Sequence, residues 1–244
     1  MTPMADNRIL CVILAGGLGT RISDLAKDIP KSMIALNGRP FVDHQLRLLK
    51  QSGVQEVILS VGYRGEMIRD YVGDGASWGI GVSYVDEGAD LRGTGGAIRF
   101  IQEHGKLPEK FFLLYGDSYL PVDYRAIWTA FDSQGLPALL TVLRNAGNWD
   151  KSNIIYKDNK IMLYDKFAED TANMDYIDAG LAILTRDLVS TYFFDKERFD
   201  LAEIYTMLSK KSFLGSYEVF KRFYEVGSAK GLKELSDKFA HGAF

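Results

Sequence analysis

The sequence predicts an α/β protein with a mostly parallel central sheet flanked by helices and followed by a mixed-sheet extension. Two observations lead to this class. Up to about residue 135, short β-rich runs alternate with helical patterns, which is typical of a parallel sheet layered by helices. From about residue 136 to 240, several β-rich runs follow one another before helical patterns return. The chain has 244 residues without a visible linker or repeat, so we expect a single domain over 1–244.

The first half alternates strands with helices. We expect strands at 8–15, 56–63, 81–87 and 110–119, and helices at 39–53, 65–74 and 93–105. The run "RILCVILA" at 8–15 is almost wholly apolar, as a central parallel strand covered on both faces requires. In 39–53, the apolar residues recur near helical spacing and Gly53 ends the pattern. In a sheet of this kind, ligands bind at the carboxyl ends of the strands.

The second half contains strands broken by turns. We expect strands at 137–143, 152–158, 159–166 and 176–184, and helices at 201–211 and 229–242. The segment "KDNK" between the second and third of these strands predicts a hairpin. This half therefore extends the first as a mixed sheet.

The composition excludes several classes of protein. A net charge of −3 argues against a nucleic-acid binder, which usually has a strongly basic face. No apolar run approaches the ~20 residues that span a bilayer, and "MTPMADNR" lacks the core of a signal peptide. The single Cys11 lies in a β-like run, which indicates a buried thiol. We expect a soluble cytoplasmic protein that binds neither nucleic acid nor membrane, and the sequence leaves open whether it forms a homo-oligomer.

The segment "AGGLGT" at 15–20 follows the first predicted strand and suits an anion, because its bare backbone exposes N–H groups. It is not a Walker P-loop, because Thr20 and Arg21 stand where Gly-Lys-Ser/Thr would close the turn. A dinucleotide fingerprint would need glycine in place of Ile22 and an acidic residue near Val61, and both are absent. A glycine turn without a ligand remains the alternative for this segment alone.

Two cations beyond the glycines favour phosphate as the ligand. Arg21 and Lys31 lie ten residues apart, and Pro30 stiffens the chain before the lysine. A guanidinium forks onto phosphate oxygens and an ammonium adds a compact charge. Either residue alone would more often be a solvated surface charge. Together with the amides of Ala15, Gly16, Gly17 and Gly19, they suit a triphosphate.

A second site is predicted at Asp117 in "FFLLYGDSY". A carboxylate at the carboxyl end of a buried strand lies at the crevice, where Mg²⁺ binding is natural. The alternative is a turn aspartate that closes an Asx-turn. Mg²⁺ takes one or two protein carboxylates besides phosphate oxygens. We therefore expect a second ligand downstream, and Glu225 in "FYEVGSAKG" is the best candidate.

Taken together and in order, these segments resemble the sugar-1-phosphate nucleotidyltransferases over about residues 8–235. The family signature G-G-x-G-T-R followed by P-K matches 16–21 and 30–31, its second Gly-rich element matches "RGTGGA" at 92–97, and its G-D-T/S motif matches 116–118. The resemblance implies the Rossmann-like fold of the nucleotide-diphospho-sugar transferases. It implies a nucleotide-binding half at about 8–135 and a sugar-phosphate-binding half at about 136–240.

The resemblance also implies the reaction. In this family, a sugar 1-phosphate oxygen attacks the α-phosphorus of a nucleoside triphosphate and releases pyrophosphate. The attacking phosphate is mostly a dianion at neutral pH, so no activating base is needed. Arg21 would then hold the leaving pyrophosphate, and Lys31 the triphosphate near its α-phosphorus. Asp117 and Glu225 would hold Mg²⁺, with Arg21, Lys31 and Asp117 as the catalytic residues.

Further residues carry over from the family by position. Glu87, Gly93 and Thr94 would bind the nucleotide, although Gly93 could equally pack helix against strand. The remaining residues, Lys166, Asp178 and Gly180, would bind the sugar phosphate, although Lys166 could simply end a hairpin strand on the surface.

The chain also departs from the family pattern. The family usually has Asp at position 225 and Asn at 178, and this chain has Glu and Asp. Arg92 and Tyr115 also stand where Leu and Asn are common.

Length and the motifs "DIPKSM", "NGRPF" and "GTGGAI" look most like the heptose 1-phosphate guanylyltransferases, with short uridylyltransferases second. No physical argument from the sequence separates guanine from uracil. A non-catalytic nucleotide-binding regulator on the same fold is a rival interpretation, favoured if Glu225 cannot hold metal. A nicotinamide-dependent oxidoreductase is disfavoured by the failed fingerprint.

Overall fold

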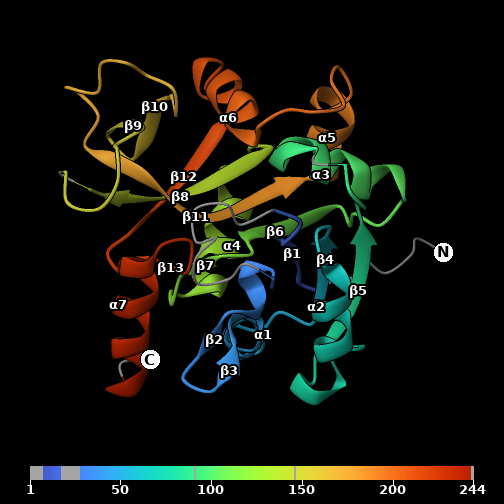
Figure 1. Cartoon of the computed structure of the whole chain (residues 1–244). Coiled ribbons are helices and arrows are strands. Elements are labelled where there is room, and N and C mark those ends of the chain that lie inside the picture. The colour runs from blue at the N-terminus through green and yellow to red at the C-terminus, as the bar shows by residue number, and fades with distance from the viewer. Residues whose placement is uncertain (1–7, 18–27, 91, 146, 243–244) are drawn as a thin grey trace.

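The computed structural model describes residues 8–17, 28–90, 92–145 and 147–242. A nine-stranded sheet runs through the centre of the molecule (Figure 1). Its main order is β12-β8-β11-β6-β1-β4-β5, and the hairpin β9–β10 joins the start of β11. These strands are β1 (Leu10–Leu14), β4 (Glu56–Val61), β5 (Gly81–Asp86), β6 (Lys110–Tyr115), β8 (Ala138–Arg144), β9 (Ile154–Lys157), β10 (Lys160–Tyr164), β11 (Tyr176–Thr185) and β12 (Leu214–Val219).

The sheet is mostly parallel, as predicted. β6, β1, β4 and β5 are parallel neighbours, and β12 is parallel to β8. β11 runs antiparallel to both β6 and β8, which marks the change to the mixed part of the sheet. The predicted hairpin is confirmed: β9 and β10 are antiparallel, and Asp158 and Asn159 between them both have positive φ, at 51° and 59°.

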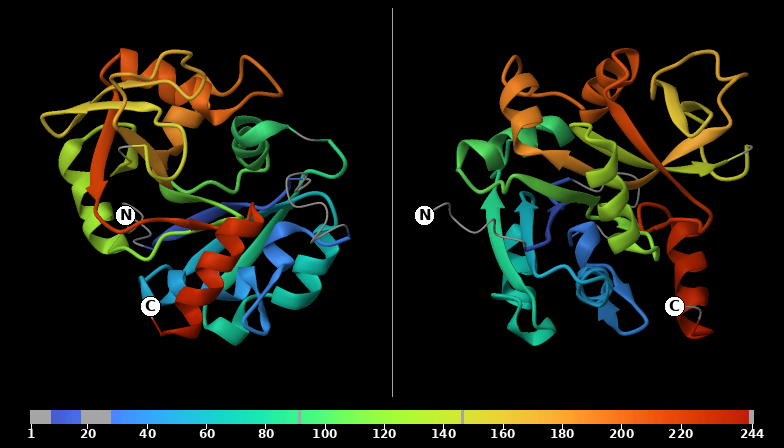
Figure 2. Two further views of the ribbon diagram at one scale, coloured as in Figure 1. Left: turned by 60° about the vertical axis from the view of Figure 1, so that its left-hand side comes forward. Right: turned by 180° about the vertical axis from the view of Figure 1, so that it is seen from behind.

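Helices cover both faces of the sheet (Figures 1 and 2). α3 (Gly93–Glu103), α5 (Arg186–Tyr192) and α6 (Leu201–Lys210) pack on one face, while α1 (Phe41–Gln51), α2 (Gly65–Val72), α4 (Tyr124–Gln134) and α7 (Ala229–Ala240) pack on the other. The side chains of β1 alternate between these layers, with Cys11 and Ile13 in one core and Leu10 and Val12 in the other. Both cores are apolar, so burial on the two faces holds the sheet at the centre.

Three of the longer elements were absent from the expectations drawn from the sequence: α4, α5 and β12. α4 is bounded by ordinary signals, because the Asp123 side chain accepts a hydrogen bond from the Ala126 N–H and Gly135 ends the helix with φ +62°. β12 has a glycine in its interior, which weakens a strand pattern. Tertiary pairing with β8 along its whole length supplies what the local sequence lacks.

Short elements complete the fold. They are β2 (Ala35–Leu36) with β3 (Arg39–Pro40), β7 (Ser118–Tyr119) with β13 (Tyr224–Glu225), and the 3₁₀ turns η2 (Lys31–Met33) and η3 (Ala76–Trp78), of which η3 lies just before the start of β5. The pairing of β13 with β7 places residue 225 beside residue 118, although the two are far apart in the sequence.

Among the helices in the described ranges, none combines the length and the apolar run that crossing a bilayer requires. The cytoplasmic location stays a prediction.

Candidate functional site

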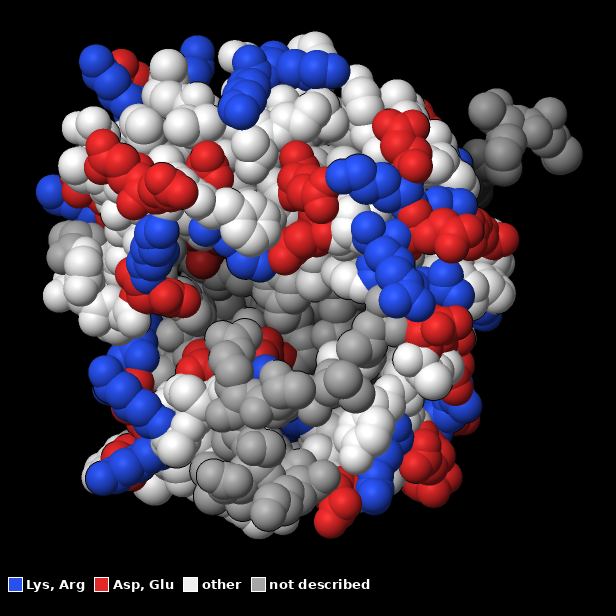
Figure 3. Space-filling view, turned by 45° about the horizontal axis from the view of Figure 1, so that its top comes forward, with Lys and Arg blue, Asp and Glu red and all other residues white. Residues whose placement is uncertain are grey.

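A cavity of about 580 Å³ opens at the edge where β1 and β6 end. Figure 3 shows a hollow on this face, with side chains of both charges around it. Its lining includes most residues that the sequence singled out: Ala15, Gly16, Gly17, Lys31, Glu87, Gly93, Thr94, Asp117, Lys166, Asp178 and Gly180. Gly19, Thr20 and Arg21 lie outside the described residues. The structure thus brings predicted nucleotide-binding residues and predicted sugar-phosphate-binding residues to one cavity. The role of each residue stays a prediction.

The segment that carries Asp117 is held through all of its backbone carbonyls from 115 to 118. The buried Gln45 side chain donates from Nε2 to the carbonyls of Tyr115 and Ser118, at 2.9 and 2.8 Å. The hydroxyl of Ser32 donates to the carbonyl of Gly116 at 3.0 Å, and the Val226 N–H donates to the carbonyl of Asp117 at 2.9 Å. Since buried carbonyls need donors, these contacts from α1, η2 and the residue after β13 fix the loop that carries the carboxylate.

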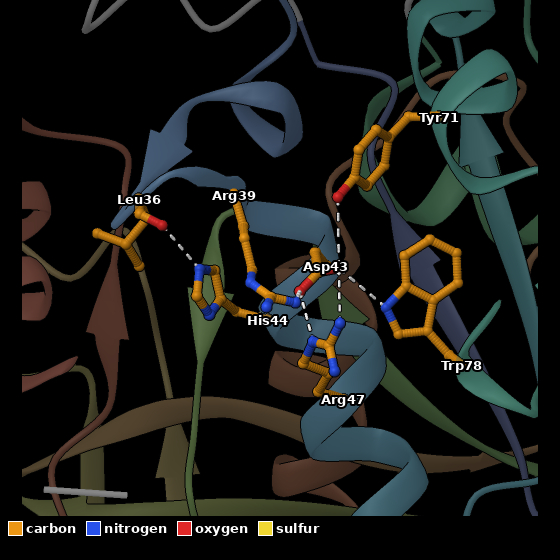
Figure 4. Close-up of polar contacts among 7 residues, drawn as sticks. All are labelled: Leu36, Arg39, Asp43, His44, Arg47, Tyr71 and Trp78. Carbon is orange, nitrogen blue, oxygen red and sulfur yellow. Dashed lines mark hydrogen bonds and ion pairs between the residues drawn. The ribbon is translucent and has the colours of Figure 1, made fainter. Parts of the chain in front are cut away.

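Helix α1, which carries Gln45, is itself anchored by a buried carboxylate (Figure 4). Asp43 is 2% exposed and accepts from Arg47 Nε at 2.6 Å, Trp78 Nε1 at 3.1 Å and the Tyr71 hydroxyl at 3.3 Å. Burial alone raises the pKa of this carboxyl, but the Arg47 guanidinium and the Trp78 N–H together hold it below its ordinary value. The network therefore ties α1 to α2 and η3, at a distance from the cavity.

Asp117, Glu225 and Lys31 form one charged cluster beside the cavity. Lys31 Nζ lies 2.9 Å from Asp117 Oδ2, and both side chains are mostly buried. A Cβ placed on Gly227 would lie 2.4 Å from Glu225 Oε2, 3.1 Å from Asp117 Oδ2 and 3.2 Å from Lys31 Nζ. Two carboxylates and one ammonium thus surround a point that only glycine leaves open.

This donor set fits Mg²⁺ bound together with a phosphate. Mg²⁺ prefers oxygen ligands and uses one or two carboxylates when substrate phosphates complete its shell. Across 8–17, 28–90, 92–145 and 147–242, no cluster of three or more His, Cys, Asp or Glu side chains could hold a metal ion alone. The two carboxylates therefore suit a metal delivered with a nucleotide, and the Mg²⁺ requirement stays a prediction.

The backbone at Gly16 lies close to Glu87. A Cβ on this glycine would lie 3.0 Å from Glu87 Oε1, which accepts a hydrogen bond from the Ser60 hydroxyl at 2.7 Å. Burial raises the pKa of the Glu87 carboxyl, and the Ser60 contact and the nearby Arg92 charge partly oppose the rise. Glu87 thus lies against Gly16 at the wall of the cavity.

The second Gly-rich element packs tightly against the chain before α6. A Cβ on Gly93, where φ is +73°, would lie 2.5 Å from the Phe199 carbonyl oxygen. On Gly95 it would lie 2.1 Å from the Phe199 ring, and on Gly96 2.4 Å from the Glu197 carbonyl oxygen. Gly93 therefore packs the start of α3 against the segment before α6 and not against a strand, and it also lines the cavity.

Asp178, which the sequence predicts to bind the sugar phosphate, lies in the cavity wall at an irregular point of β11. The register shifts between Asp178 and Ala182, and Gly180 within this stretch has φ +85° and donates its N–H to Asp178 Oδ1 at 2.8 Å. Burial raises the pKa of the Asp178 carboxyl to about 6, against the opposing effects of the Gly180 N–H and the Lys166 charge. This residue is therefore a carboxyl that titrates near neutral pH inside the site.

Asp178→Asn should make the stability of the protein less dependent on pH. The folded-state pKa lies above the unfolded value, so the wild type loses stability as pH rises from about 4 through about 6, while asparagine stays neutral. The variant should match the wild type at pH 4 and gain about 2 to 3 kcal/mol in free energy of unfolding at pH 8. Urea unfolding at both pH values measures this difference. Asp175→Asn, at an exposed carboxylate, is the control; an equal change in both variants would contradict the interpretation.

Three residues that shape the site were not identified from the sequence: Gln45, Ser32 and Asp200. Asp200 lines the cavity and begins α6 with a capping box completed by Glu203. The pattern Asp-x-x-Glu before an apolar run was a usable signal for the helix start. Nothing local to Gln45 or Ser32 indicates their partners, which lie more than 65 residues away in the sequence.

Comparisons with known proteins agree with the fold and the motifs. The model of the nucleotidyl transferase family matches residues 10–177. A D-glycero-alpha-D-manno-heptose 1-phosphate guanylyltransferase of Campylobacter jejuni is 30% identical over 79% of this chain and 82% of its own. One of the same name from Aneurinibacillus thermoaerophilus is 36% identical over 48% of this chain and 50% of its own. The crystal structure of HddC from Yersinia pseudotuberculosis superposes with a TM-score of 0.77 and 25% identity, covering 95% of this chain and 99% of that one.

Proposed function

We propose, from the premise that this chain belongs to the nucleotidyl transferase family, that it transfers GMP from GTP to a heptose 1-phosphate in a Mg²⁺-dependent reaction. The products would be the GDP-heptose and pyrophosphate. The chain is a sugar-1-phosphate nucleotidyltransferase, and the choice of base and sugar follows the names of the relatives. The observation that carries the proposal is one cavity that is lined both by the Lys31–Asp117 pair and by Lys166 and Asp178.

Catalysis in this site rests on position and charge. A sugar phosphate is already a dianion, so the chain needs no base to activate it. Lys31 would place its ammonium against the triphosphate, and the amides of 15–17 would face the same phosphates. Lys166 would hold the attacking sugar phosphate, and Asp178 would accept hydrogen bonds from sugar hydroxyls. When bound between Asp117 and Glu225, Mg²⁺ would neutralise charge on the phosphates.

Pyrophosphate release across four NTPs and a panel of sugar 1-phosphates tests the proposal. The panel includes D-glycero-α-D-manno-heptose 1-phosphate, mannose 1-phosphate and glucose 1-phosphate. We expect the highest kcat/KM with GTP and the heptose phosphate, and loss of turnover in EDTA that Mg²⁺ restores. Preference for UTP would reassign the base, and no release with any pair would favour a non-catalytic regulator.

A further inference from the structure

Asp200 is a carboxylate in the cavity wall whose position is fixed by a helix. It is the N-cap of α6, and its Oδ1 accepts from the Ala202 N–H at 2.9 Å. The Thr94 hydroxyl donates to the same oxygen at 3.3 Å, and this hydroxyl accepts from the Leu201 N–H at 2.8 Å. One oxygen of the carboxylate is therefore committed to the starts of α6 and α3, which hold the group in place.

The other oxygen faces a lysine. Asp200 Oδ2 accepts from Lys166 Nζ at 2.7 Å. Lys166 follows the end of β10, and its side chain is 48% exposed. A lysine side chain is long and flexible, so holding its ammonium at one place in a cavity costs conformational entropy. The fixed carboxylate opposes that loss by keeping the ammonium at the cavity before any substrate arrives.

The pair suits substrate binding better than it suits stability. Exposed ion pairs add little to the free energy of folding, and both side chains here are about a third to a half exposed. An ammonium has three N–H donors, so one can keep its hydrogen bond to Asp200 while the other two donate to phosphate oxygens. Asp178 lines the same cavity, close enough for the charges of Lys166 and Asp200 to shift the pKa of its carboxyl.

We propose that Asp200 is a positioning residue: it holds the Lys166 ammonium in the orientation that receives the phosphate of the sugar 1-phosphate. This inference rests on the proposed function. It assigns Asp200 no contact with the reacting atoms, so its effect must pass through Lys166.

A double-mutant cycle tests this dependence. Asp200→Asn removes the charge but keeps an N-cap residue for α6, because asparagine caps as well as aspartate. In the proposed reaction with GTP saturating, Asp200→Asn should raise KM for the sugar 1-phosphate about tenfold and leave KM for GTP within about twofold. Lys166→Met should raise the same KM at least as much. The double variant should resemble Lys166→Met alone, because the carboxylate then has nothing left to position.

A matched control is available at another helix. Asp123 caps α4 in the same way, accepting from the Ala126 N–H, and does not line the cavity. Asp123→Asn should leave both KM values unchanged, and melting temperatures of all variants report on folding. The sugar phosphate used is the one with the highest turnover in the panel above.

The outcomes separate the two proposals. If wild-type protein releases no pyrophosphate with any pair, the proposed function fails and this inference fails with it. If the wild type is active but Asp200→Asn leaves KM for the sugar phosphate unchanged, the inference alone is overturned. Additive effects in the double variant would likewise overturn it, because they would show a role independent of Lys166.

Discussion

Asp117→Asn is expected to lower kcat by about 10³-fold while the protein stays folded. Asparagine has nearly the same shape, and the carbonyls of 115–118 keep their donors from Gln45, Ser32 and Val226. What is lost is the negative charge that faces both Lys31 and the proposed Mg²⁺. Pyrophosphate release at saturating GTP and sugar phosphate measures kcat, and the melting temperature should change by no more than about 5 °C.

Two further variants test whether the loss of kcat is specific to the proposed metal site: one at an ion pair elsewhere and one at the second proposed Mg²⁺ ligand. Asp132→Asn makes the same change in the Lys110–Asp132 pair, which does not line the cavity, and should leave kcat unchanged. Glu225→Gln should lower kcat and raise the Mg²⁺ concentration needed for half-maximal rate. Activity of the wild-type level in Asp117→Asn would remove Asp117 from the metal site.

Lys31→Met should lower kcat by about 10²- to 10³-fold, with a smaller effect on KM for GTP. Methionine keeps most of the stem, which is largely buried, and removes only the ammonium. Because the charge that develops on the departing phosphates is greatest in the transition state, the loss should fall on the chemical step. Single-turnover rates at saturating GTP separate this step from binding.

Lys50→Met is the control for this second variant. Lys50 donates to the Gly79 carbonyl outside the cavity, so its loss should leave single-turnover rates unchanged. If Lys31→Met raised KM for GTP while kcat stayed constant, the ammonium would contribute to binding alone.

The order of elements was predictable because burial and periodicity are local signals. The run at 8–15 becomes the central strand β1, and the helical patterns after 39, 65 and 93 become α1, α2 and α3. β12 could not be predicted as readily, because it depends on its partner β8 and carries a glycine, whereas α4 has ordinary boundary signals in Asp123 and Gly135. Local propensity is a weak guide where tertiary pairing decides the conformation.

The candidate site was predictable where a motif carries its own chemistry. Gly16, Gly17 and Asp117 follow the ends of β1 and β6, and these parallel neighbours bring their ends to one edge, where Lys31 pairs with Asp117. Glu225 was identified only as a carboxylate after an apolar run, and the pairing of β13 with β7 explains its approach to Asp117. Gln45 and Asp200 could not be predicted from the sequence as site residues, because their roles depend on contacts with residues far away in the sequence.

A crystal structure with Mn²⁺ and a non-hydrolysable GTP analogue tests the central claim most directly, since the anomalous signal of Mn²⁺ locates the metal. We expect the metal between the Asp117 and Glu225 carboxylates, with the triphosphate against the 15–17 segment and Lys31. An analogue bound elsewhere, or a metal site that involves neither carboxylate, would contradict the account.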